Sequence, residues 1–66
     1  MKSTETITET TYQAKFRAEG QEKVRESLEY SDRASAERWL ASWFTKSPNG
    51  LGAIHKTTLE VEVFEA

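Results

Sequence analysis

The chain has 66 residues, enough for one domain with a small core. It contains no cysteine, which excludes disulfides and thiolate metal sites. A formal net charge of -2 is too small to steer the whole chain strongly toward nucleic acid. No apolar run approaches the roughly 18 residues of a membrane span, and no signal peptide is recognisable. We therefore expect a single soluble domain, residues 1–66, in the cytoplasm.

The first ten residues are polar and rich in threonine, with Ile7 as the one apolar residue after Met1. Untied termini of this composition tend to fray. We expect residues 1–10 to form a polar lead-in, frayed at its start, that joins the first strand.

Residues 12–19 alternate cleanly between apolar and polar side chains. This period of two predicts a half-buried strand. The inward set is Tyr12, Ala14, Phe16 and Ala18, and Lys15 and Arg17 are among the residues that point outward.

A turn at Gly20 predicts a hairpin, with residues 23–30 as the return strand. We expect Val24, Leu28 and Tyr30 to face inward. Glu26 falls on the same inner face, which is tolerable if this strand lies at an edge of the sheet.

The stretch from Asp32 to Lys46 predicts an amphipathic helix. Asp32 is suited to cap its first turn, and Pro48 and the Asn49-Gly50 pair end it. Its apolar stripe, which we expect to form much of the core, consists of Ala36, Trp39, Leu40, Trp43 and Phe44.

Residues 51–54 read as a short apolar loop that caps the core, and residues 55–66 as the last strand. In that strand Leu59, Val61 and Val63 are expected to face inward. The chain therefore predicts an α+β fold of order β-β-α-β. Its three-stranded antiparallel sheet has the order 2-1-3, with the helix packed on one face.

Catalysis is difficult to build from these residues. His55 is the only histidine and Asp32 the only aspartate, and the aspartate is better explained as a helix cap. No clustered metal ligands and no glycine-rich phosphate loop after a strand are present. We expect a protein that is not an enzyme and that uses no cofactor or metal.

The open face of the expected sheet is the candidate partner-binding surface. It can be a solvated face with cross-strand charge pairs, or a docking surface for an acidic partner or a nucleic-acid backbone. The negative total charge disfavours nucleic acid. The candidate residues are Lys15, Arg17, Lys23, Arg25, Glu60, Glu62 and Phe64.

The stretch from Gly20 to Ile54 carries a pattern of short motifs. Ser42-Trp43-Phe44 is followed by Pro48 and then by Gly50-Leu51-Gly52 with Ile54. This pattern resembles small phage anti-CRISPR proteins of type I-F. The matched residues look like fold determinants, so the resemblance assigns no partner-contacting residue.

The resemblance implies a non-enzymatic phage inhibitor in the host bacterial cytoplasm. It would bind a type I CRISPR-Cas surveillance complex or its nuclease and block recognition of target DNA. Acidic residues such as Glu60, Glu62 and Glu65 would meet a basic groove that normally holds nucleic acid.

Alternative functions stay open. The β-β-α-β order also resembles a small phage inhibitor of host RNA polymerase, in architecture only. A small nucleic-acid-binding protein and a homodimeric structural module are the other two.

Overall fold

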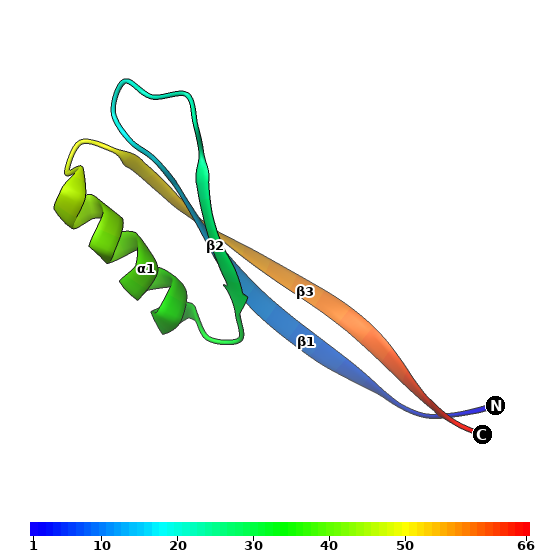
Figure 1. Ribbon diagram of the computed structural model, residues 1–66. Coiled ribbons are helices and arrows are strands. Elements are labelled where there is room, and N and C mark those ends of the chain that lie inside the picture. The colour runs from blue at the N-terminus through cyan, green and yellow to red at the C-terminus, as the bar shows by residue number, and fades with distance from the viewer.

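The computed structural model describes all 66 residues and contains three strands and one helix (Figure 1). In chain order these are β1 (Lys2–Arg17), β2 (Arg25–Tyr30), α1 (Arg33–Lys46) and β3 (Leu51–Glu65). The antiparallel sheet has the order β2-β1-β3. The predicted α+β fold, strand order and single helix are confirmed. The helix is neither long nor apolar enough to cross a membrane.

The predicted starts of all three strands are wrong. β2 begins at Arg25 and not at residue 23. β1 begins at Lys2, so residues 2–10 are part of a strand and not a lead-in. β3 begins at Leu51, so the expected apolar loop belongs to that strand. The reason is pairing at long range: β1 and β3 are aligned from Lys2 opposite Glu65 to Arg17 opposite Leu51. The threonine-rich start of the chain suits such a strand, because β-branched residues favour it.

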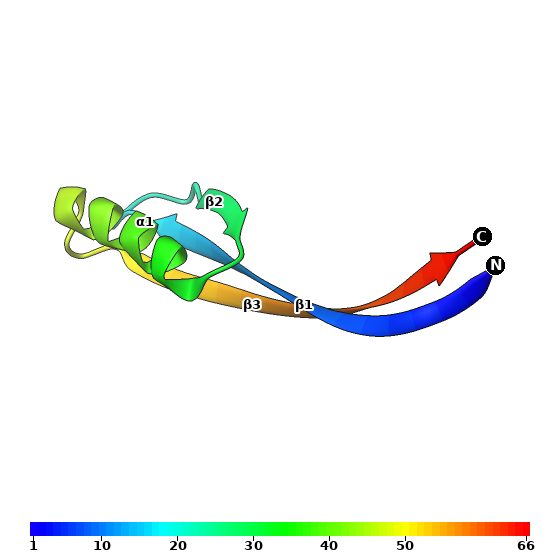
Figure 2. The same cartoon turned by 90° about the horizontal axis from the view of Figure 1, so that it is seen from below.

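β1 and β3 extend well past the helix and β2 as a two-stranded arm, and both termini lie at its far end (Figures 1 and 2). β2 pairs only with the segment of β1 from Tyr12 to Phe16. The molecule is correspondingly elongated, 53 Å in its longest dimension and 13 Å in its shortest. We call residues 2–10 and 58–65 the ribbon, and residues 11–57 the body.

The core lies in the body, where α1 packs on the sheet. Phe16 is 1% exposed, and Ala14 and Ala36 are fully buried. The Phe16 ring stacks on Trp43 at 5.8 Å between centroids and meets Phe44 edge-on at 5.2 Å. The predicted inward placement of Ala14 and Phe16, and of the helix stripe around Ala36, is confirmed.

Glycine lets β3 pass closely beneath the helix. A Cβ atom on Gly52 would lie 2.7 Å from a methyl carbon of Leu40 and 3.0 Å from the Phe44 ring. A side chain at this position would require Leu40 and Phe44 to shift. Gly52 therefore faces the helix and fixes which side of β3 is covered.

A β-bulge in β2 overturns the predicted inner face of that strand. Gln13 lies opposite Glu29 and Lys15 opposite Glu26, so β2 has one extra residue between these pairs. An extra residue reverses the sidedness of what precedes it. Consequently Val24 and Leu28 are not core residues, at 49% and 77% exposed.

The bulge instead buries Ser27, whose hydroxyl forms hydrogen bonds with backbone groups of β1 and β2. This hydroxyl accepts a hydrogen bond from the Ala14 N–H at 2.8 Å and donates one to the Leu28 carbonyl at 2.7 Å. Glu26, expected on the inner face, forms an ion pair with Lys15 at 3.3 Å. The exposed fraction of the Glu26 side chain is 54%, so this carboxylate does not enter the core.

Replacing Phe16 by alanine should lower the free energy of unfolding by about 3–5 kcal/mol, because the lost ring leaves a cavity between β1 and α1. Urea unfolding followed by tryptophan fluorescence measures this. Phe64→Ala is the matched control: this ring is 50% exposed at the far end of the ribbon, and its removal should change the value by less than about 0.5 kcal/mol. Equal losses for the two variants would contradict the location of the core.

Ser27→Ala should destabilise the protein by about 1–3 kcal/mol, because the buried Ala14 N–H loses its acceptor. The control is Ser42→Ala on the exposed surface of α1, where the hydroxyl bonds only to the Trp39 carbonyl. Chemical denaturation of both variants compares the two sites. A Ser27 variant as stable as the Ser42 variant would refute the bulge.

Candidate binding surfaces

Of the two residues considered for catalysis from the sequence, Asp32 has a structural role and His55 lies away from it. Asp32 is the N-cap of α1: its carboxylate accepts hydrogen bonds from the Ser35 N–H at 2.8 Å and from the Ser35 hydroxyl at 2.9 Å. These bonds lower the pKa of Asp32 below its ordinary value. His55 is exposed opposite Gln13. No group of three or more histidine, cysteine or acidic side chains is placed to hold a metal ion.

The β1–β3 register divides the sheet into two faces. Phe16 lies opposite Gly52 and Ala14 opposite Ile54, so the even-numbered residues of both strands are on the helix side. From Glu5 opposite Val63 to Arg17 opposite Leu51 this register has no irregularity. Because side chains alternate along a strand, the odd-numbered residues of this stretch lie on the opposite side. We call that side the open face.

The predicted partner-binding residues do not form one surface. Lys15 and Arg17 lie on the open face, as expected. Arg25 lies opposite Phe16 and packs its guanidinium over the Trp43 ring, 4.6 Å from the ring centroid. Lys46 also lies over that ring, at 4.9 Å. The placement of Arg25 on the open face is wrong, because the bulge reverses that end of β2.

The remaining predicted residues are also separated from the basic pair. Glu60 and Glu62 lie opposite Thr8 and Thr6, on the helix side of the sheet but out on the ribbon. Phe64 follows them on the same side of β3, opposite Ser3. Lys23 precedes β2 and is exposed. The prediction that Glu60, Glu62 and Phe64 share the face of Lys15 is therefore wrong.

The physical reason is that β3 extends past the end of α1. Alternation in the sequence separates Leu59, Val61 and Val63 from the glutamates, but it does not say which set is covered. The body fixes the answer, since Gly52 and Ile54 face α1. The three apolar residues, assigned to the core from the sequence, consequently lie on the open face.

Charge is divided unequally between ribbon and body. The ribbon carries five glutamates and one lysine, a formal charge of -4, whereas the body has eight basic and six acidic residues, a formal charge of +2. Four of the ribbon glutamates face uncharged residues across the strands and form no ion pair: Glu5, Glu9, Glu60 and Glu62. The ribbon is therefore an acidic extension of a weakly basic body.

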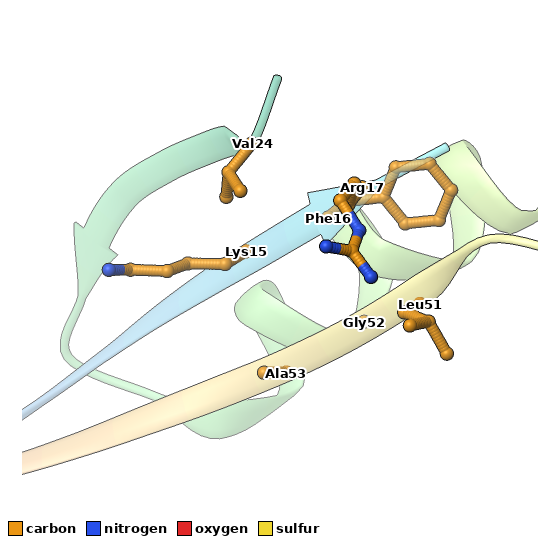
Figure 3. Close-up of a pocket in the computed structure, with 7 residues that line it drawn as sticks. All are labelled: Lys15, Phe16, Arg17, Val24, Leu51, Gly52 and Ala53. Atoms are coloured by element: carbon orange, nitrogen blue, oxygen red, sulfur yellow. The ribbon is translucent and has the colours of Figure 1, made fainter. Parts of the chain in front are cut away.

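The open face also carries exposed apolar side chains that sequence reasoning missed as a surface. On the ribbon these are Ile7 and Leu59, which is 55% exposed, beside the half-buried Val61 and Val63. On the body, Val24 and Leu51 border an open depression of about 200 Å³. Figure 3 shows Lys15, Arg17 and Ala53 around the same depression, with the Phe16 ring directed away from it. The glycine at position 52 is the sequence signal that could have revealed this sidedness.

Comparison with known proteins adds no relative: no family model, curated protein or solved structure matches the chain.

The Asp32 cap predicts a specific acid sensitivity. Because folding lowers the pKa of this carboxyl below its ordinary value of 3.8, its contribution to stability is present above that value. It is lost as the pH falls through the lower pKa of the folded state. Asp32→Asn, which retains a capping oxygen without the charge, should differ from the parent most at neutral pH and least at strongly acidic pH. Thermal unfolding across this range tests it, and a stability difference that is constant with pH would contradict it.

Proposed function

We propose that the protein is a non-enzymatic inhibitor that uses its acidic ribbon to occupy a basic, nucleic-acid-binding surface of another protein. The observation that carries this proposal is the charge of -4 on the ribbon, with four glutamates free of ion pairs. The candidate target is a type I CRISPR-Cas surveillance complex or its nuclease. That choice rests on the resemblance of residues 20–54 to phage anti-CRISPR proteins.

The shape of the ribbon supports insertion into a groove. It is two strands wide and projects past the helix (Figure 1), so a partner can approach it from more than one side. Glu60 and Glu62 follow each other at i and i+2 on one side of β3, which spaces their carboxylates by about 7 Å along the strand. Carboxylates arranged in this way suit arginine and lysine side chains, with which they form charge-assisted hydrogen bonds.

The same distribution argues against direct nucleic-acid binding by this chain. The projecting part is negative and would repel phosphates. Of the basic residues suggested for such a role, Arg25 packs on Trp43 and Lys15 pairs with Glu26. A protein partner with a basic groove fits these surfaces better than a nucleic acid does.

The test is a pull-down from a nuclease-treated bacterial lysate that contains type I CRISPR machinery. The parent protein should capture a Cas subunit, and Glu60→Gln with Glu62→Gln should reduce recovery about tenfold or more, because two charge-assisted contacts are lost. Glu19→Gln with Glu22→Gln is the matched control, since it removes the same charge from an exposed loop of the body.

The outcomes separate the candidate targets. Recovery of RNA polymerase with the same dependence on Glu60 and Glu62 would support binding through the ribbon. It would identify RNA polymerase as the target in place of a CRISPR-Cas subunit. Capture that is insensitive to the ribbon pair, or no capture of either complex, would refute the proposal.

A further inference from the structure

The molecule exposes more surface than its mass requires. Its accessible surface is 5127 Å², whereas a compact monomer of 7.5 kDa exposes about 4,200 Å². Only four residues are buried. The excess of about 900 Å² is close to the roughly 800 Å² that each partner buries in a standard protein interface.

Apolar residues indicate where this excess lies. Apart from Met1 and Phe64, the exposed large hydrophobic side chains lie on the open face or on the neighbouring edge around β2: Ile7, Val24, Leu28, Leu51 and Leu59. The helix covers the opposite side of the body. The open face is thus the side of the sheet that has no covering layer. The solvated face of an antiparallel sheet usually carries polar residues, whereas this face carries apolar ones.

We propose that a second copy of the chain covers the open face and that the two sheets pack face to face as an antiparallel, two-fold dimer. The occupant is inferred from the charges along this face. Glu5 and Glu9 lie toward the ribbon end, and Glu29 of β2 lies near the middle, opposite Gln13. At the body end Lys15 pairs with Glu26 of β2, whereas Arg17 has no ion pair and is the free cation of this face. The face is therefore self-complementary when the second copy runs in the opposite direction, as a two-fold interface requires.

A parallel arrangement would place the two Arg17 side chains together and the Glu5 and Glu9 side chains of the two copies together, which like-charge repulsion disfavours. In the antiparallel arrangement a two-fold axis near the Thr11–Thr57 pair brings the Arg17 level of one copy to the Glu5 level of the other. Leu51 of one copy then lies over Val63 of the other, and Ala53 lies over Val61. Apolar residues of one ribbon consequently cover the depression on the partner's body.

The dimer covers Glu5 and Glu9 but leaves free the two glutamates that the pull-down tests. Glu60 and Glu62 lie on the other side of the ribbon and stay exposed in both copies. Failure of the dimer would leave the pull-down result unaffected, and the reverse also holds.

Sedimentation equilibrium over a range of protein concentrations tests the proposal. The parent should approach twice the 7.5 kDa of one chain. Arg17→Glu should weaken the dimer about tenfold or more, because two symmetry-related attractions become repulsions. Glu5→Lys should do the same, and the double variant should restore the parent dissociation constant to within about threefold.

The rescue cannot arise inside one chain. Twelve residues of extended strand separate Glu5 from Arg17, about 40 Å, which is several times the screening length at physiological salt. Both side chains are exposed, so the single variants should retain the parent far-UV circular dichroism. Glu62→Lys, a charge reversal on the other side of the same ribbon, is the control and should not weaken the dimer.

A parent that stays monomeric at the highest attainable concentration would overturn the proposal. A dimer that Arg17→Glu leaves intact would overturn it in favour of pairing between the free strand edges, in which open-face side chains take no part. Failure of the double variant to recover would refute the antiparallel arrangement.

Discussion

The packing of Phe16 between α1 and the sheet is the contact on which the rest of the structure depends. It is the one large side chain that is fully buried, and it holds both Trp43 and Phe44. Its position makes the even-numbered side of β1 the covered side, and the opposing Gly52 lets β3 follow. The open face and the side of the sheet on which the ribbon glutamates lie both follow from this packing.

Local patterns predicted the parts of the fold that are determined locally. The helix stripe, the Asp32 cap and the alternation around Ala14 and Phe16 were all recognisable because each is decided within a few residues. The inner face of β2 was not recognisable, because the bulge depends on a hydrogen bond between the Ser27 hydroxyl and the Ala14 N–H of β1. The extension of β1 over residues 2–10 was also missed, because its stability comes from pairing with residues 48 to 63 positions away.

The candidate surfaces were harder to predict for a related reason. The net charge of -2 is the sum of -4 on the ribbon and +2 on the body. Only the strand boundaries show which residues belong to the ribbon. Alternation in β3 separates valines from glutamates but is symmetric between the two faces. A register fixed in the body, far from the ribbon, removes that symmetry. Glu60 and Glu62 were thus assigned to the wrong side of the sheet.

The small core and the two faces of the ribbon are connected through the stability of the fold. Four buried residues give a 66-residue chain little hydrophobic stabilisation, so any association that covers the open face also favours the folded state by mass action. The glutamates on the other side have no such coupling to folding: they face threonines across the strands and form no ion pair. One side of the ribbon is therefore suited to stabilising the protein through self-association. The other is suited to recognising a basic partner, because its carboxylates have no competing charge within the chain.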